Sequence, residues 1–379
     1  MNLTIERGPA LAALRRLADV VDRKSTVPIL GNIALAAEGG SLCLRATNLD
    51  MEASETFGAD VGQDGALTLP ADKLRDIVSN SETGSQISLA LSENGLRMAV
   101  KSGRSRFNVA GLPAEDFPAF KAEDFVSDFT MSAKTLADMV TRVAWAMERS
   151  DTLPFGNVYL ADQGDELHAV GAAQTGIALR REPLPAGARL KAMMTPRLVA
   201  HLIRWLGDDE NEVRILVTGS AYDDDGPARL IRFEQPGSVL TSKLFDAPAY
   251  VDYLRHMPAP REFVATTDQD ALKAAIKRVL IMSEEKSRLI SLGFAPGSVS
   301  VRVRGSTLGD GEDEIAADYD GPEIRFPLSA APLLDALEAL KGDRVEIGFN
   351  EKPDGDDAKV SISAPVDPAM SCFLMKLRG

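Results

Sequence analysis

The chain has 379 residues, and its 42 Lys and Arg against 56 Asp and Glu leave a formal net charge of −14. With 45% hydrophobic and 26% charged residues, the composition is that of a globular protein and excludes an intrinsically disordered chain, and the length predicts two or three domains. Because a polyanion is repelled by net negative charge, the whole-chain balance argues against a nucleic-acid partner.

A short strand followed by a helix-periodic run occurs six times along the chain. In chain order the strand and the helix of each unit are expected over residues 3–5 and 9–22, 67–70 and 74–78, 129–131 and 136–147, 193–196 and 198–206, 263–264 and 272–282, and 324–327 and 333–340. In the first of these helices, Leu11, Leu14 and Val21 lie on one apolar stripe, which is typical of a helix with one buried face.

Three prolines mark the second, fourth and sixth of these units. Pro70, Pro196 and Pro327 each stand between the expected strand and the expected helix, and they are 126 and 131 positions apart. Proline is suited to that place, because it lacks a donor for the sheet and presets the helical φ. Alternating apolar and polar residues then predict strands after each second helix. The matched order and spacing indicate a threefold repeat.

The repeat predicts an α+β protein of three similar domains, each with two helices packed on antiparallel sheets of about eight short strands. We expect the domains at residues 1–121, 122–258 and 259–379. The boundaries fall near the proline-containing and acidic stretch at 118–128 and near the proline-rich stretch at 257–261.

Acidic and basic residues are distributed differently along the chain. Acidic clusters at 208–210, 223–225, 312–314 and 354–357 are expected in loops. Basic residues instead accompany five of the six expected helices, whereas the sixth carries Asp335 and Glu338. If the basic faces line one common surface, that surface can hold a phosphate backbone without reading sequence. For any single helix, a charged face that is merely solvated explains the pattern equally well.

Motifs of enzyme chemistry are missing. His168, His201 and His256 are scattered without zinc-ligand spacing, and the chain has no phosphate-binding loop, nucleophile elbow or dinucleotide fingerprint. Cys43 and Cys372 are too few for a disulfide framework. The sequence also lacks a run of about 18 apolar residues and a signal peptide, so we expect a soluble, cytoplasmic, non-catalytic protein without metal or cofactor and without a membrane partner.

Six segments form a set of motifs distributed over the chain. They read TVPILGN at 26–32, ATNLDME at 46–52, SGRSRF at 102–107, LPAEDFP at 112–118, TSKL at 241–244 and SEEK at 283–286. Together they resemble the bacterial sliding clamp family, the β subunit of DNA polymerase III, over essentially the whole chain. The resemblance implies a homodimer of three-domain subunits that closes head to tail into a ring with its helices toward the central hole. Such a ring tethers the replicative polymerase to duplex DNA as a processivity factor.

The resemblance also implies roles for individual residues. Contacts to DNA are expected from Lys24, Lys73, Arg149 and Arg197. The dimer interface is expected to place Phe107 and Val109 against Ile281 and Met282, and Arg97, Arg104 and Arg106 against Glu312, Asp313 and Glu314. Solvated surface charges and an ordinary apolar core are the alternative readings of these residues.

In this family, peptides from polymerases and the clamp loader bind a hydrophobic cleft, and here the cleft sequence departs from the family pattern. The run that usually reads ATDGHRLA is GAAQTGIA at 171–178, and the usual C-terminal MPMRL is MKLRG at 375–379. The expected cleft residues are Phe155, Thr175, Gly176, Ile177, Tyr250, Val251, Met375, Lys376, Leu377 and Arg378. Lost anchors change the specificity of an apolar groove or weaken it.

Three functions are compatible with these observations. The chain is a replicative clamp with a divergent cleft, a clamp-like paralogue with altered or lost peptide binding, or a hydrolase with a carboxylate site on a clamp-like scaffold. In either clamp reading the charge of −14 changes its meaning, because an acidic exterior around a basic bore keeps DNA inside the ring.

Overall fold

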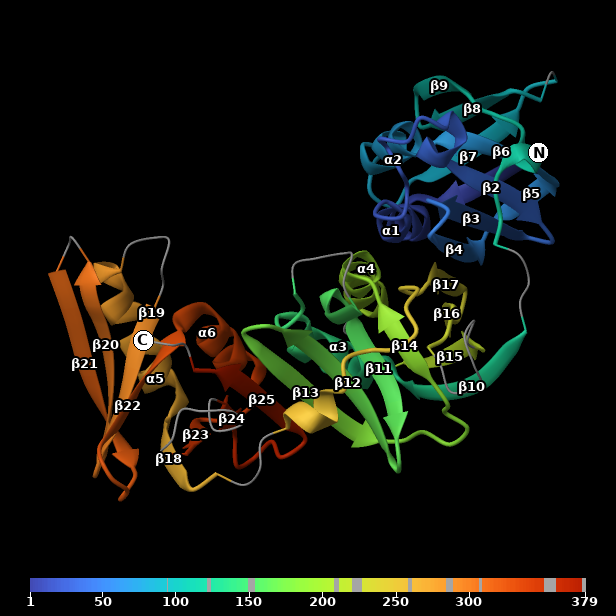
Figure 1. The fold of residues 1–379 in the computed structure, drawn as a ribbon. Coiled ribbons are helices and arrows are strands. Elements are labelled where there is room, and N and C mark those ends of the chain that lie inside the picture. Colours follow the sequence, from blue (N-terminus) through green and yellow to red (C-terminus); the bar gives the residue numbers. More distant parts are fainter. Residues whose placement is uncertain are drawn as a thin grey trace. The chain divides into compact units, whose positions relative to one another are not determined.

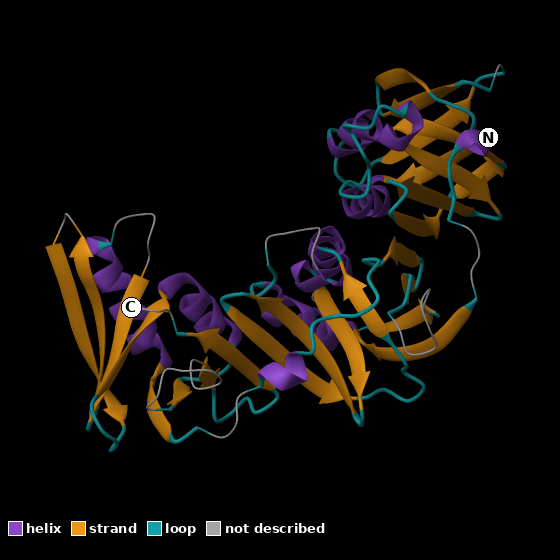
Figure 2. Ribbon diagram, in the orientation of Figure 1, coloured by secondary structure: helices purple, strands orange, loops and turns teal. Residues whose placement is uncertain are grey.

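The computed structural model describes residues 1–93, 95–120, 124–148, 154–207, 211–219, 227–257, 261–283, 289–306, 309–350 and 359–376 (Figures 1 and 2). The chain divides into two compact units. Unit 1 consists of residues 1–134, 200–221 and 228–244, and unit 2 of residues 135–199, 222–227 and 245–379. The division into three domains stays a prediction.

Unit 1 is built on two antiparallel sheets. The smaller has the order β5-β1-β7-β8-β9, with β5 Asp60–Gln63, β1 Asn2–Glu6, β7 Gln86–Leu91, β8 Arg97–Ser102 and β9 Ser105–Ala110. The larger has the order β10-β15-β16-β17-β4-β3-β2-β6, with β10 Phe125–Ser132, β15 Glu212–Thr218, β16 Leu230–Gln235, β17 Ser238–Lys243, β4 Met51–Gly58, β3 Ser41–Thr47, β2 Asn32–Glu38 and β6 Gly65–Pro70. Strands β4 and β17 pair although they are far apart in sequence.

Helices α1, Arg7–Leu17, and α2, Ala71–Ser79, lie side by side in unit 1 (Figure 1). Helix α1 buries Leu11, Leu14 and Leu17, the period expected of a helix with one apolar face. It ends five residues before the predicted Asp22, although Val20 and Val21 in the following turn are also buried. Apolar residues in a turn thus prolonged the helical pattern of the sequence beyond the helix itself.

A twelve-stranded sheet runs through unit 2 in the order β14-β11-β12-β13-β25-β24-β23-β18-β21-β20-β19-β22. The strands are β14 Lys191–Met194, β11 Val158–Gln163, β12 Glu166–Ala173, β13 Gly176–Pro183, β25 Met370–Met375, β24 Lys359–Ser363, β23 Arg344–Phe349, β18 Phe263–Asp268, β21 Gly309–Asp318, β20 Ser298–Ser306, β19 Leu289–Ala295 and β22 Ile324–Ser329. Helices α3 Ala133–Ala144, α4 Pro196–Leu206, α5 Gln269–Val279 and α6 Ala330–Ala339 complete the described helices.

The strand-then-helix unit recurs six times in the described residues, which confirms the predicted α+β clamp fold. The units are β1–α1, β6–α2, β10–α3, β14–α4, β18–α5 and β22–α6. Pro70 ends β6 and Pro196 begins α4, as expected. Pro327 lies inside β22 instead of at its end. It is tolerated there because β22 is the outermost strand of its sheet, so one side of the strand needs no amide donor.

Candidate functional sites

Three basic side chains on the helices turn toward protein oxygens and not toward a common outer face. Arg7 donates to two carbonyls at the end of α2, at 3.2 and 2.9 Å. Arg16 lies 2.7 Å from the carboxylate of Glu55, which is 2% exposed. Arg142 is 7% exposed and pairs with the equally buried Asp367. The basic residues that accompany the helices therefore do not all face a common surface, because protein oxygens near these helices require donors.

Two of the four cations expected on DNA belong to one surface of unit 1. Lys24 follows α1, Lys73 lies in the first turn of α2, and both are exposed. Their neighbours Arg23 and Asp72 form an ion pair of 3.1 Å, which holds the turn after α1 against the start of α2. The two lysines therefore lie on neighbouring parts of the same surface.

The other two expected DNA residues are Arg197 and Arg149. Arg197 is exposed at the second position of α4, whereas Arg149 lies outside the described residues. On α5, Lys277 is exposed, while Lys273 pairs with Asp270 at 2.8 Å. The helices of unit 2 thus also present some of their basic residues to solvent.

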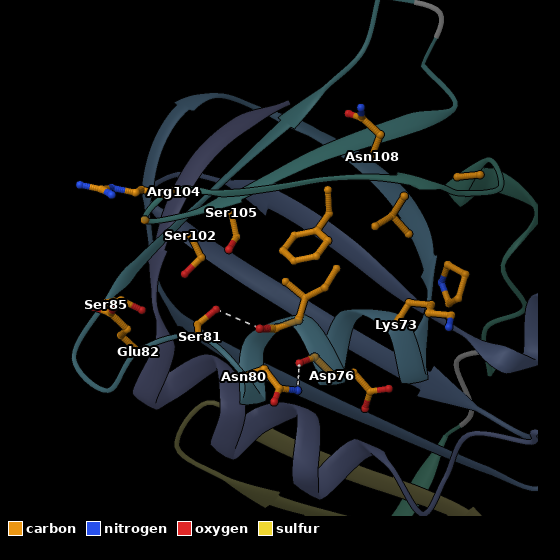
Figure 3. Close-up of a pocket in the computed structure, with 16 residues that line it drawn as sticks. Lys73, Asp76, Asn80, Ser81, Glu82, Ser85, Ser102, Arg104, Ser105 and Asn108 are labelled. Carbon is orange, nitrogen blue, oxygen red and sulfur yellow. Dashed lines mark hydrogen bonds between the residues drawn. The ribbon is translucent and has the colours of Figure 1, made fainter.

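Strand β9 forms an edge of the five-stranded sheet and carries much of the first half of the expected dimer interface. It pairs with β8 alone, and the exposed Arg106 and Phe107 lie on it, together with the half-buried Val109. Arg104 lies in the turn before it and points away from the molecule (Figure 3). Arg97, at the start of β8, is exposed as well. Four of the five side chains on this hairpin are therefore open to solvent.

A cavity of about 1250 Å³ opens between β9 and helix α2 (Figure 3). Phe107, Val109 and Ile77 give it an apolar side, and Lys73 and Asp76 line its helical side. An apolar hollow beside an unpaired strand edge is a surface on which another chain can pack.

The second half of the expected interface lies on β21 and the short helix η5, Leu280–Met282. Ile281 is 76% exposed, and Met282 packs beside Gly309 and Gly311 of β21. Strand β21 pairs with β20, and on its other edge Ala317 and Asp318 pair with β18, whereas residues 311–316 have no strand partner on that edge among the described residues. The acidic run 312–314 lies in this strand and not in a loop, because cross-strand pairing with β20 extends it at the sheet surface.

Two carboxylates of the acidic run already have partners within the chain. Asp313 pairs with Arg278 of α5 at 2.5 Å, and the hydrogen bond from that guanidinium holds the pKa of Asp313 below its usual range. Glu312 lies 3.4 Å from Arg325. Glu314, by contrast, is exposed on the same strand. Glu312 is exposed as well and lies two positions before Glu314 on the strand, so the electrostatic role expected for the run falls mainly on Glu314, with Glu312 beside it and partly paired.

A second cavity, of about 280 Å³, lies wholly within unit 2 and collects half of the expected cleft residues. It is lined by Phe155, Ala172, Ala173, Gln174, Gly176, Ile177, Val251, His256, Lys359, Phe373 and Met375. The pairing of β13 with β25 places Ile177 directly opposite Phe373. Gly176 is required at the neighbouring pair, because a Cβ there would lie 2.4 Å from the Phe373 carbonyl oxygen. The cavity is therefore an apolar pocket with a few polar groups, suited to apolar side chains.

Three described residues of the expected cleft do not line this cavity. Tyr250 packs on Tyr159 with ring centroids 4.6 Å apart, and Thr175 uses its carbonyl to accept the Met375 amide at 3.0 Å. Lys376 turns away from the cavity: its ammonium donates to a backbone carbonyl and lies 4.6 Å from the centre of the Phe326 ring. The last two expected residues, Leu377 and Arg378, lie outside the described residues.

Sequence reasoning left several lining residues out. Three of them lie in the run 171–178, which departs from the family pattern: Ala172, Ala173 and Gln174. Their side chains are small or polar, so nothing in the sequence marked them as the lining of an apolar cavity. Phe373 is two positions before Met375, and the period of a strand could have found it. His256 and Lys359 come from distant segments, and nothing local marks them.

A chain of polar contacts connects the segment 245–257, which contributes Val251 and His256 to this cavity, with strand β12. Nδ1 of His168, on β12, lies 2.8 Å from the Tyr253 hydroxyl, and its Nε2 lies 3.0 Å from the Glu166 carboxylate. The Tyr159 and Tyr250 rings pack beside Tyr253 in one cluster. Burial raises the pKa of all three tyrosines, so their hydroxyls stay protonated and available as donors.

Within the described ranges, no group of three or more His, Cys, Asp or Glu side chains is placed to hold a metal ion. None of the described helices is long and apolar enough to cross a membrane.

Comparisons with known proteins agree with this architecture. Residues 1–121 match the model of the DNA polymerase III beta subunit N-terminal domain, and residues 255–377 match that of its C-terminal domain. The beta sliding clamp of Caulobacter vibrioides strain NA1000 is 34% identical over 385 residues, which cover 100% of both chains.

Solved structures give the same result. A crystal structure of the Caulobacter crescentus beta sliding clamp with bound polyethylene glycol superposes with a TM-score of 0.92 at 32% identity, over 100% of this chain and 99% of that one. The sliding clamp of Bartonella birtlesii bound to griselimycin superposes with a TM-score of 0.91 at 27% identity over 100% of both chains. These similarities favour the sliding clamp over the clamp-like paralogue.

Proposed function

This chain belongs to the DNA polymerase III β subunit family, the bacterial sliding clamps, and we propose that two copies close head to tail into a ring around duplex DNA. The ring holds a polymerase on its template by topology, so the chain itself is non-catalytic. Replication proteins, including polymerase and clamp-loader subunits, bind it through short apolar peptides in the cavity of unit 2.

The observation that best supports ring closure is the presence of two complementary strand edges on one chain. The edge at β9 is basic through Arg104 and Arg106, and the edge at β21 is acidic through Glu312 and Glu314. Unpaired strand edges tend to pair with another chain, and opposite charges fix which edges meet. Two different surfaces that meet in a closed dimer give a heterologous, head-to-tail arrangement.

Charge exchange tests this closure. The double variant Arg104→Glu, Arg106→Glu is expected to be monomeric at micromolar concentration in analytical ultracentrifugation, because both edges are then acidic. A second double variant, Glu312→Arg with Glu314→Arg, is expected to be monomeric for the opposite reason. Mixing the two restores both complementary edges and is expected to restore a dimer. A dimer in either variant alone, or monomers after mixing, contradicts the proposal.

Contacts to DNA are proposed for the exposed Lys24, Lys73 and Arg197, with Arg149 as a fourth. The neighbouring placement of Lys24 and Lys73 supports a small phosphate-binding surface. A ring that topology retains needs only loose, sequence-independent phosphate contacts.

The salt dependence of duplex binding tests these contacts. Lys24→Ala or Lys73→Ala is expected to reduce the slope of log affinity against log salt by about 0.9, because each change removes about one phosphate contact. The control is Lys243→Ala on β17, which removes an exposed lysine outside the proposed surface and is expected to leave the slope unchanged. Equal slopes for all three variants contradict the assignment.

The proposed peptide site rests on the apolar lining of the 280 Å³ cavity, which persists although the family's cleft motif is changed. A peptide with apolar residues and a Gln anchor is expected to bind the wild type with micromolar affinity. Ile177→Asp, which puts a charge into the lining, should weaken binding more than tenfold. Val366→Asp is the matched control, because Val366 is 74% exposed and outside the cavity. No binding of the wild type at millimolar peptide would instead support the paralogue.

A further inference from the structure

We propose that His168 is a positioning residue of the peptide cavity: it ties the segment that forms one wall to strand β12, which contributes other residues to the lining. The inference rests on the proposed peptide site and adds a residue that does not itself line the cavity. Both parts are in unit 2, so the geometry does not depend on how the units are arranged.

The wall comes from residues 245–257, which contribute Val251 and His256 to the cavity. Strand β12 contributes Ala172 and Ala173, near its end, to the same cavity. His168 stands on the same strand, 6% exposed, and its Nδ1 meets the hydroxyl of the 3% exposed Tyr253 at 2.8 Å. A buried polar contact thus joins two of the segments that line the cavity.

The carboxylate of Glu166 determines which atom donates and which accepts in the hydrogen bond between His168 and Tyr253. It lies 3.0 Å from Nε2 of His168 and accepts a hydrogen bond from the N–H group when that nitrogen carries the ring proton. In the neutral ring Nδ1 then keeps its lone pair and accepts the hydrogen bond of the Tyr253 hydroxyl. Glu166, His168 and Tyr253 therefore form a directed chain in which both ring nitrogens have a partner.

Other hydrogen bonds from the wall to the rest of unit 2 include one at its start and one near its middle. Phe245 donates its amide to Met193 at 2.9 Å, and the Tyr250 hydroxyl donates to Asn157 at 3.3 Å. The remaining contacts include the stacking of Tyr250 on Tyr159, which permits sliding more easily than a hydrogen bond does. Tyr253 lies between Val251 and His256, so its fixed hydroxyl sets the position of both lining residues.

A double-mutant cycle on peptide affinity tests the connection. His168→Leu and Tyr253→Phe each remove the bond, and each is expected to weaken peptide binding by about two- to tenfold, the equivalent of one net hydrogen bond. The double variant should be no weaker than either single one, because both act through the same contact. Independent, multiplying losses contradict the proposal.

Rescue separates positioning from a general loss of packing. In His168→Asn the amide oxygen stands near the place of Nδ1 and can accept the Tyr253 hydroxyl, so affinity should return to within about twofold of the wild type. Tyr319→Phe is the matched control: it removes a buried tyrosine hydroxyl bonded at 2.7 Å elsewhere in unit 2, and it should leave affinity unchanged. An asparagine variant as weak as the leucine variant overturns the assignment.

Hydrogen exchange tests the same connection without any peptide. The amides of Tyr253 and Met257 are bonded within the wall, at 2.7 and 3.2 Å. They should exchange faster in His168→Leu than in the wild type, and near the wild-type rate in His168→Asn. If the wild type binds no peptide, the proposed function fails while this readout still decides the role of His168. Unchanged exchange of these amides contradicts that role.

Discussion

Two junctions between strands remote in sequence hold the sheets together, and they use charge differently. At the first, in unit 1, β4 pairs with β17, and Glu55 stands directly opposite Ser238, whose hydroxyl donates to it at 2.5 Å. At the second, in unit 2, β13 pairs with β25. There Arg142 of α3 donates to the Ala339 carbonyl at the end of α6 and pairs with Asp367, which precedes β25.

The difference lies in which charged groups are buried: only the carboxylate at the first junction, but both the guanidinium and its carboxylate at the second. The first junction depends on a buried carboxylate, and burial raises the pKa of Glu55 despite its contacts with Ser238 and Arg16. The second is organised by a guanidinium, which stays charged at any pH the protein meets. We therefore expect the stability of the first junction to change with the protonation of Glu55. The stability of the second should depend on the carboxylates of Asp367 and Asp138, which compensate the buried charge of Arg142.

The largest effect is expected from Asp367→Ala at the second junction. The change leaves the Arg142 guanidinium buried with Asp138, at 3.3 Å, as its one remaining anionic partner among the described residues. Breaking a buried pair in this way costs about 3–5 kcal/mol. Local opening free energies from hydrogen exchange of the Arg181 and Met375 amides, which bond across the junction, measure it.

Arg142→Met combined with Asp367→Leu is the control for that change. Replacing both charges avoids an uncompensated ion, so the double variant should lose less than Asp367→Ala alone. If the single variant is as stable as the wild type, the buried pair does not organise this junction.

A smaller effect is expected from Glu55→Ala at the first junction. The change leaves the Ser238 hydroxyl, which is buried, without its acceptor, while Arg16 is partly exposed and recovers water. The expected cost is about 1–3 kcal/mol, measured by exchange of the Thr56 amide, which donates to Gly237 at 2.6 Å. A larger loss here than in Asp367→Ala would reverse the order of the two junctions.

The repeated strand-and-helix units were predictable because their signal is local. Leu11, Leu14 and Leu17 repeat at helical spacing and are buried as the spacing requires. The exposed edges could not be predicted from pattern alone. The acidic run 312–314 has the composition of a loop, and only its pairing with β20 makes it a strand.

The ion-pair partners of the basic residues could not be predicted from neighbouring positions in the sequence either. Arg142 is one of the basic residues that accompany the expected helices, but its buried partner Asp367 is 225 positions away in the sequence. The cavity of unit 2 has the same origin, since Ile177 and Phe373 meet only through strand pairing. The resemblance to a family supplied Ile177 and Met375 as cleft residues, whereas Phe373, which the two-residue period of a strand places on the same face as Met375, was not among them.

A pH series on Glu55→Gln tests whether the stability of the first junction depends on the protonation of Glu55. A carboxyl whose folded pKa is raised contributes stability that is complete below its unfolded pKa and is lost as pH rises through the folded pKa. Glutamine stays neutral at every pH. The local opening free energy of the wild type at the first junction, relative to that of Glu55→Gln, should therefore fall as pH rises above about 4.5. Exchange of the Thr56 amide, corrected for its intrinsic rate at each pH, gives this difference. A difference that is flat or rises with pH contradicts the assigned role of burial.

The smallest effects are expected from the exposed lysines at the rims of the two junctions. Lys243 lies 3.2 Å from Asp50, and their side chains are 54% and 75% exposed, so Lys243→Ala should change stability at the first junction by less than about 0.5 kcal/mol. Lys341, at the second junction, lies 2.7 Å from Asp138, which is only 25% exposed and also contacts Arg142. Lys341→Ala should therefore cost more than Lys243→Ala, because it removes a cation from a less hydrated carboxylate. Hydrogen exchange of the same junction amides measures both losses of stability. If Lys243→Ala and Lys341→Ala cost the same, then Lys341 does not contribute to the charge network around Arg142 and Asp367.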